Sequence, residues 1–290
     1  MWMLLAFSCA FLTATSASIS KIILRRNNEY LVGWLGLIIS APILLFILFL
    51  IDIPKLDALF FQSLLILIPL EIAAYILYIK AIKHSPLSLT LPFLAMTPVF
   101  IILTGRIVLG ETINRAGISG IAFVAIGAYL LNVHTLQSGF LEPLRSISKE
   151  RGSVYIIIVS FIYSITAVLG KLAINHSSAM FFSAVYYPIV SIFLLPLVII
   201  KYRQGVIEPG MLKKDRYLLI FLGVSFALTM ILHCIGISMT KAAYMIAVKR
   251  LSMVFAVFYG WILFKEKQIA RRLFGALVML IGVLIIAFAG

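Results

Sequence analysis

The stretch AAYMIAVKRLSMVFAVFYGWILF, residues 242–264, places two adjacent cations inside an otherwise apolar run. The run is long enough to cross a bilayer as a helix, which needs about 20 apolar residues. Lys249 follows Ala242 by seven positions, which corresponds to roughly 10 Å of helix. Lys249 and Arg250 are therefore expected near the middle of a hydrocarbon core about 30 Å thick.

Each charge at that depth costs roughly 2.5–3.5 kcal/mol. We therefore predict that Lys249 and Arg250 do not face lipid. They face a water-filled cavity, an internal counter-charge or an anionic ligand, and a carboxylate or phosphate is the ligand that suits them. The alternative is an internal ion pair that only fixes helix packing.

The composition predicts an all-α, polytopic membrane protein. The chain is 63% hydrophobic and 12% charged, whereas a soluble domain has about 45–50% apolar and about 25% charged residues. The long continuous apolar runs exclude a barrel, whose strands alternate in polarity. The net charge of +14 is assigned to cytoplasmic loops that contact lipid headgroups, and no nucleic-acid partner is expected.

The chain divides into ten apolar stretches joined by short connections. The longest connections are 134–152 and 201–215. The first of these lies near the midpoint and divides the chain into a first repeat (1–133), a connecting loop (134–152) and a second repeat (153–290). The ten predicted spans are 2–20, 31–51, 59–79, 86–109, 115–133, 153–174, 179–200, 216–238, 242–264 and 269–289.

The two halves resemble each other. ILTGRIVLGETINRAGISGIAFVAIGAYLL (102–131) aligns without a gap on VFYGWILFKEKQIARRLFGALVMLIGVLII (257–286), at a shift of 155 residues. Five spans per copy is an odd number, so the copies cross the membrane in opposite directions. Such inverted repeats enclose a substrate site near the midplane, and their shared glycines also permit close helix packing. The alignment pairs Thr97 with Ser252, Gly105 with Gly260, Glu111 with Glu266, Gly120 with Gly275, and Gly127 with Gly282.

Loop charges predict the orientation. The connections after the first, third, fifth, seventh and ninth spans carry most of the lysines and arginines. Because cytoplasmic loops are enriched in these residues, both termini are predicted to lie outside the cytoplasm.

One face of the 242–264 span predicts a cavity lining. Met245, Lys249, Ser252, Ala256 and Gly260 are spaced by three or four residues, as on one side of a helix. The first repeat offers the equivalent stripe Leu94, Thr97, Ile101 and Gly105. The predicted substrate-binding residues are Lys249, Arg250, Ser252, Thr97, Tyr244, Tyr75 and Tyr78.

Glu71 is the main acid inside a predicted span, and Tyr75 and Tyr78 follow it at four and seven residues on the same helical face. We predict that it neutralises one of the two cations when the site is empty, or that it carries a coupling proton. The alternative is a structural salt bridge with Arg250 or Lys249.

Other polar residues in the spans have structural explanations. Lys21 and Lys171 are expected to snorkel to the interface, and His233 is expected to be a hydrogen-bonded core histidine. Pro188 is expected to interrupt its span. Cys9 and Cys234 imply no disulfide framework, and no metal or cofactor motif is present in the sequence.

The spans, the inverted repeat and the Gly-x5-Glu segments GRIVLGE (105–111) and GWILFKE (260–266) resemble the EamA-type transporters of the drug/metabolite transporter superfamily. The resemblance implies a ten-helix bundle with a central cavity and alternating access, and it implies cytoplasmic termini, opposite to the loop charges. VKRLS (248–252) also resembles the span 9 motif of nucleotide-sugar transporters, with Arg250 on the motif's lysine and Lys249 on its asparagine.

We therefore expect a secondary transporter, not an enzyme, in the cytoplasmic (inner) membrane. The expected partners are a small anionic or zwitterionic metabolite and membrane lipid, with either a proton or a counter-substrate as the coupling species, and the protein is a monomer or a homodimer. One alternative is an exporter of amino acids, amines or drugs in which Glu71 is the key residue. A second is a membrane-embedded enzyme that acts on a phosphate headgroup.

Overall fold

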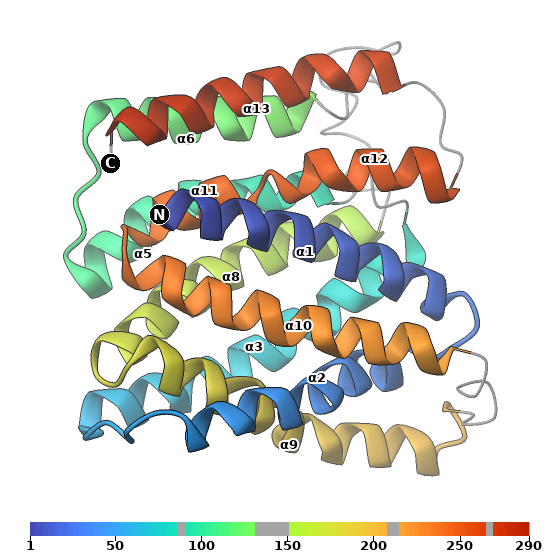
Figure 1. Cartoon of the computed structure of the whole chain (residues 1–290). Helices are drawn as coiled ribbons and strands as arrows, with labels where there is room; N and C mark the ends of the chain where they lie inside the picture. The colour runs from blue at the N-terminus through green and yellow to red at the C-terminus, as the bar shows by residue number, and fades with distance from the viewer. Residues whose placement is uncertain (86–90, 131–150, 208–214, 265–268, 290) are drawn as a thin grey trace.

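The computed structural model describes residues 1–85, 91–130, 151–207, 215–264 and 269–289, and it is all-α, as predicted (Figure 1). In the first half these residues form α1 (Trp2–Leu24), α2 (Glu29–Phe46), the short η1 (Ile47–Phe49), α3 (Ala58–His84), η2 (Leu91–Ala95), α5 (Met96–Leu109) and α6 (Arg115–Leu130). In the second half they form α8 (Arg151–Asn175), α9 (Ala179–Arg203), α10 (Arg216–Ser238), α11 (Ala242–Lys249), α12 (Ser252–Phe264) and α13 (Ile269–Ala289).

The helices match the ten predicted spans to within a few residues at most ends. In the described part of the chain, seven helical segments are long and apolar enough to cross a membrane. Three further apolar segments are shorter, Phe93–Leu109, Arg115–Leu130 and Phe274–Ala289. Both termini lie at the same end of the bundle (Figure 1).

The α9 helix runs without a break through Pro188 and Pro196, so the predicted interruption at Pro188 is wrong. A proline removes one backbone hydrogen bond, but membrane helices tolerate this because nearby hydroxyls and small backbone adjustments satisfy the freed groups.

The fourth and ninth spans are each discontinuous, and their breaks are equivalent. The 3-10 turn η2 ends at Ala95 and α5 begins at Met96, while α11 ends at Lys249 and α12 begins at Ser252. The 155-residue shift that aligns the two halves places Ala95 on Arg250. The stretch 242–264 is therefore not one continuous helix. The predicted stripe assumed a continuous helix across this stretch. Breaks at matching positions are typical of inverted-repeat transporters, where they surround the binding site.

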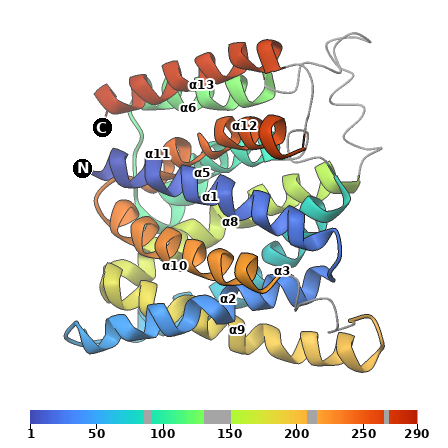
Figure 2. The ribbon, with the colours of Figure 1, turned by 45° about the vertical axis from the view of Figure 1, so that its right-hand side comes forward.

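The two halves are interleaved, because the main packing partners of each half belong to the other half. Helix α1 packs on α10 and α12, and the repeat-equivalent α8 packs on α3 and α5. The pairs α2–α9 and α6–α13 each join a helix to its own equivalent. Figures 1 and 2 show α6 and α13 side by side at one edge of the bundle.

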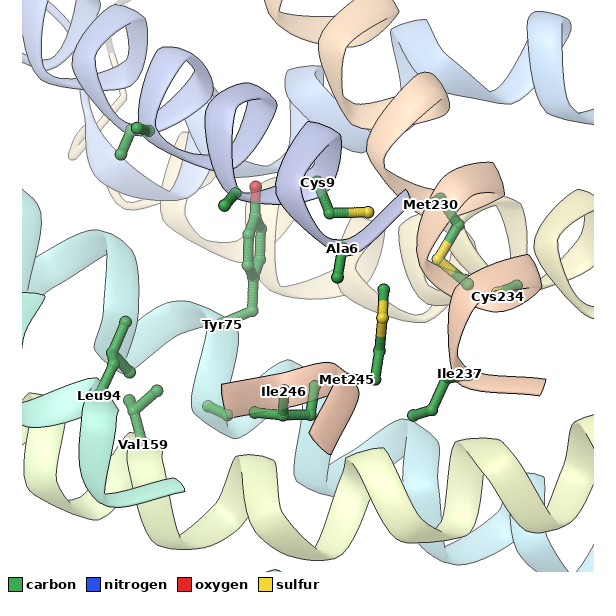
Figure 3. Close-up of a cluster of buried hydrophobic side chains, with 14 of the residues drawn as sticks. Ala6, Cys9, Tyr75, Leu94, Val159, Met230, Cys234, Ile237, Met245 and Ile246 are labelled. Carbon is green, nitrogen blue, oxygen red and sulfur yellow. The ribbon is translucent and has the colours of Figure 1, made fainter. Parts of the chain in front are cut away.

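Cysteine and methionine side chains fill the core between α1, α10 and α11. Figure 3 shows Cys9 of α1 near Met230 of α10, with Met245 of α11 below Ala6. The Cys9 thiol donates to the carbonyl of Thr229 at 3.6 Å. Both cysteines are buried free thiols.

At the end of the bundle that carries the termini, Asp57 joins α3 to the α8–α9 connection. Its carboxylate accepts the Phe60 amide at 3.0 Å and lies 2.6 Å from His176 Nδ1. The Phe60 amide and then the His176 ring hold the pKa of Asp57 below its ordinary value, because both favour the charged carboxylate.

Glycines bring the backbones of α6 and α13 into contact. A Cβ at Gly127 would lie 2.5 Å from the Met279 nitrogen and 2.7 Å from the Gly275 carbonyl oxygen. A Cβ at Gly282 would lie 2.6 Å from the carbonyl oxygen of Gly120. Of the glycines that the repeat alignment pairs, Gly120, Gly127 and Gly282 therefore serve close helix packing, as predicted.

Substitution of Gly127 by valine should destabilise the protein by about 1–3 kcal/mol, because the side chain would meet backbone that cannot move aside. The change is measured as a fall in the thermal unfolding temperature in detergent. Ala122→Val is the matched control, since Ala122 is on the exposed face of the same helix. Equal unfolding temperatures for the two variants would contradict the close contact.

Candidate functional site

A cavity of about 190 Å³ lies between the two halves and is bordered by side chains from α1, α2, α3, α8, α9, α10 and α11, with Leu94 of η2. Pockets for drug-sized ligands are roughly 300–1,000 Å³, so this cavity suits a small metabolite. Its charged lining residues are Glu71, Lys171, Lys249 and Arg250.

Arg250 lines the cavity and is only 5% exposed. Its Nη2 donates to the hydroxyl of Thr97 at 2.8 Å, so the guanidinium is held across the boundary between the two halves. Its Nε has no hydrogen-bond partner among the described residues. The prediction that Arg250 faces a cavity instead of lipid is confirmed, and one of its buried donors lacks a partner in the described part of the chain.

Lys249 also lines the cavity. It is half-buried, and within the described ranges no hydrogen bond or ion pair involves its ammonium group. Its charge interacts with that of Arg250, beside it in the chain, and with that of Glu71 across the cavity. The two cations therefore concentrate positive charge in one small space.

Glu71 lines the same cavity but does not pair with Arg250. Thr166 and Tyr186 line the cavity with it. The alternative of a salt bridge between Glu71 and either cation is therefore wrong for the conformation that the structure describes. Its proposed service as counter-charge or proton carrier stays a prediction.

Among the predicted binding residues, Tyr75 and Tyr78 line the cavity with the two cations. The Tyr75 hydroxyl donates to the Gly33 carbonyl at 3.0 Å, so its ring is the part available to a ligand. Thr97 and Ser252 are buried and lie outside the cavity lining. Thr97 acts on the cavity only through Arg250.

Tyr244 also lies away from the cavity. Its hydroxyl donates to Asn114 Oδ1 at 3.2 Å, and its ring covers Gly117, where an added Cβ would meet the hydroxyl at 2.1 Å. The predicted stripe also fails at Ser252, which follows the turn between α11 and α12. Met245 precedes that turn and is outside the cavity lining too, so the turn explains only part of the failure. Of the two stripes, only Leu94 and Lys249 line the cavity.

Several lining residues were missed or were given another role. Tyr186 and Tyr187 of α9 and His233 of α10 line the cavity, whereas the sequence predicted a span interruption near the tyrosines and a satisfied core histidine. Thr13, Ser16 and Ser20 of α1 line it as well. Their spacing of three and four residues puts them on one helical face, and this polar stripe in an apolar span is the signal that could have found them.

Lys171 does not snorkel to the interface. It is only 9% exposed, forms an ion pair with Glu111, and donates to the Thr240 carbonyl at 2.6 Å. The other carboxylate oxygen of Glu111 accepts the amide of Ala242, at the start of α11, at 2.9 Å. A buried carboxylate holds Lys171 inside the bundle, and the ion pair borders the cavity at the end that carries the termini.

The Gly-x5-Glu segment places this carboxylate. Gly110 ends α5 with a left-handed φ of 67°, and the Glu111 amide then donates to the Gly105 carbonyl at 3.2 Å. The Glu111 carboxylate lies 3.7 Å from where a Cβ at Gly105 would be, which is ordinary van der Waals contact. The repeat-equivalent Glu266 lies outside the described residues.

The first half repeats part of this arrangement. Lys21 donates to the carbonyl of Ser85, and the 155-residue shift aligns Ser85 with Thr240. Lys21 lies at the end of α1 and Lys171 at the end of α8, so the two lysines close opposite ends of the bundle with the same kind of contact. Lys21 is half-buried and bonds to carbonyls at the end of α3, so its snorkelling to the interface stays a prediction.

Replacement of Glu111 by glutamine should cost about 3 kcal/mol of stability, because it leaves the buried Lys171 charge without a counter-charge. Thermal unfolding in detergent checks this. The control is Glu29→Gln, which removes the carboxylate paired with Lys83; that lysine is 30% exposed against 11% for Lys171. The control should lose about 1 kcal/mol or less. An equal loss in both variants would show that the Lys171–Glu111 ion pair contributes no more to stability than the more exposed Lys83–Glu29 pair.

Comparisons with known proteins agree with this architecture. The sequence pattern of the EamA-like transporter family matches residues 1–133 and 150–288. An uncharacterized transporter of Methanothermobacter thermautotrophicus is 28% identical over 194 residues, which cover 66% of this chain and 54% of that protein. This chain therefore matches about half the length of that curated relative. A crystal structure of a protein with 13% identity superposes with a TM-score of 0.70, covering 99% of this chain and 98% of that one.

Proposed function

This chain belongs to the EamA-like transporter family, and on that premise we propose that it carries a small anionic or zwitterionic metabolite, bearing a phosphate or carboxylate, by alternating access. The chain is a multi-pass membrane transporter, not an enzyme. The alternative of an enzyme acting on a phosphate headgroup is therefore dropped.

The observation that carries the proposal is the missing counter-charge of the two cations among the described residues. Among the described residues, neither Lys249 nor Arg250 has a carboxylate partner, although both line a cavity in the membrane-spanning bundle. Unpaired charge inside a membrane protein marks a substrate or ion pathway. An anionic cargo would supply the missing partner.

The geometry supports a defined binding mode. A carboxylate or phosphate oxygen would accept the free Nε–H of Arg250, while Lys249 contributes a second charge. Thr97 holds the guanidinium through Nη2, so the arginine is oriented before the anion arrives. Such charge-assisted bonds are roughly twice as strong as neutral ones, and preorganisation reduces the entropy cost of binding.

Alternating access follows from the repeat. The anion would sit where η2 meets α5 and where α11 meets α12, at breaks that the internal symmetry relates. Rocking of one half against the other around such a midplane site exposes it to each side in turn. Glu71 would balance part of the positive charge when the anion is absent, or would carry a coupling proton.

For the orientation, the loop charges still favour termini outside the cytoplasm. Lys80, Lys83 and Arg203 lie at the end of the bundle opposite the termini, in agreement with a cytoplasmic location of that end. We propose that the protein lies in the cytoplasmic membrane with this orientation.

Removal of either cation should weaken anion binding. Lys249→Ala and Arg250→Ala should each reduce the affinity for phosphorylated or carboxylated metabolites by about 10–100-fold, since each removes a hydrogen bond to a charged group. The measurement is ligand-induced thermal stabilisation of the purified protein.

Arg203→Ala is the matched control, because Arg203 is exposed at the end of α9. It should bind as the unsubstituted protein does. Stabilisation by anions that survives in both cavity variants would refute the anion site.

A second candidate is export of an amine, amino acid or drug. The feature that favours it is the surroundings of Glu71, because the tyrosines Tyr75, Tyr78, Tyr163, Tyr186 and Tyr187 line the same cavity. A carboxylate among aromatic rings can bind an organic cation by charge and cation–π contacts.

Glu71→Gln separates the two candidates in a liposome flux assay. For an anionic cargo the variant should still bind phosphate or carboxylate probes and should change only the pH dependence of flux. For an organic cation it should abolish binding, while Lys249→Ala should leave binding intact. Loss of amine binding in Glu71→Gln together with unimpaired binding in Lys249→Ala would favour the second candidate.

A further inference from the structure

The cavity gathers most of the buried polar atoms that lack a hydrogen-bond partner. Five such side-chain atoms occur in the described part of the chain, and Asn27 Oδ1 alone among them lies outside the cavity lining. Arg250 Nε belongs to the anion site. The other three are Thr13 Oγ1 and Ser16 Oγ of α1, and His233 Nδ1 of α10.

The two α1 hydroxyls depart from the usual behaviour of hydroxyls in this bundle. Ser18 of the same helix donates to the Ala14 carbonyl at 2.9 Å, Thr229 donates to Ser225 at 2.7 Å, and Ser63 donates to Leu59 at 2.7 Å. Each thus bonds to the preceding turn of its own helix, the simplest way to satisfy a hydroxyl inside a membrane. Ser16, only 5% exposed, has no such bond.

These three groups share a wall of the cavity that carries no formal charge. α1 and α10 pack against each other, and the Cys9 thiol, one helical turn before Thr13, contacts the Thr229 carbonyl. His233 is close enough to Lys249 and Arg250 to interact with their charges. The hydroxyls and the imidazole therefore border the anion site without competing for its charge.

Resting on the proposed function, we propose that Thr13, Ser16 and His233 form a second subsite that hydrogen-bonds hydroxyl groups of the cargo. The cargo is then a hydroxylated acid or phosphate monoester, with its anionic end at Arg250 and Lys249 and its hydroxyls at the wall formed by α1 and α10.

The physical reason is that unpaired polar groups in the cavity wall make binding selective for a hydroxylated cargo. A substrate hydroxyl supplies a partner to these groups, which have none among the described residues, whereas a hydrocarbon chain leaves them buried and unpaired. A site of this kind rejects the deoxygenated analogue of its ligand far more strongly than an apolar pocket rejects an added hydroxyl. Thr13 and Ser16 are thus specificity-determining residues, separate from the groups that bind the charge.

The test uses the full-length purified protein and two matched pairs of probes, glycerol 3-phosphate with propyl phosphate, and glycerate with propionate. Affinities are measured by isothermal titration calorimetry. In at least one pair, the unsubstituted protein should bind the hydroxylated member about tenfold more tightly or better. Thr13→Val and Ser16→Ala should bring that ratio towards one and leave the affinity for propyl phosphate or propionate unchanged.

Ser18→Ala is the control, because Ser18 is also a buried α1 hydroxyl but bonds within its helix. It should keep the full preference for the hydroxylated probes. Ser16→Ala should not lower the unfolding temperature, since the lost hydroxyl has no partner to lose.

The outcomes separate the two proposals. If neither member of either pair binds, the proposed anion site fails and this subsite fails with it. If both members of each pair bind equally, the anion site stands and the α1 and α10 groups are only hydrated, which overturns the subsite. If the preference survives in the combined Thr13→Val and Ser16→Ala variant, the subsite is wrongly assigned to these residues.

Discussion

A buried cation held by the opposite half of the molecule is the constraint around which this bundle is arranged. Arg250 lies at the break in the ninth span, and its guanidinium is anchored on Thr97, beside the equivalent break in the fourth. A charge at this depth is expensive unless it is hydrogen-bonded and has access to water or a counter-ion. The interleaved packing of the halves supplies the hydrogen bond, and the cavity supplies the access.

Near-symmetry of the backbone contrasts with asymmetry of the chemistry. The packing pairs, the two helix breaks and the lysine-to-carbonyl contacts at Ser85 and Thr240 all recur in both halves. The adjacent cations occur only in the second half, because Ala95 and Leu94 occupy the equivalent places in the first. A symmetric scaffold allows two conformations of similar energy, whereas a single asymmetric charge centre defines one binding site between them.

The end of the cavity at Lys171 also contributes to the stability of the bundle. The Gly-x5-Glu segment delivers Glu111 to Lys171 and to the first amide of α11, so one short motif neutralises a lysine and caps the helix that carries the cations. Acceptance of the Ala242 amide by a carboxylate is favoured further by the positive end of the α11 dipole. The same residues therefore contribute to stability and fix where the cation-bearing helix begins.

Hydrophobic length and charge position by themselves determined that the chain is a ten-span, all-α membrane protein with an internal repeat, and that Lys249 and Arg250 avoid lipid. These follow from local transfer free energies, which depend on composition and spacing alone. Only the tertiary structure decided that Tyr244 and Ser252 leave the cavity, that Glu71 forms no ion pair with either cation in the described part of the chain, and that Lys171 is paired with Glu111. The turn between α11 and α12 changes which later residues share a face, whereas Tyr244, before that turn, is held by Asn114 of the other half. A buried polar group takes the partner that distant helices bring near, so neither outcome is contained in the spacing of residues along one span.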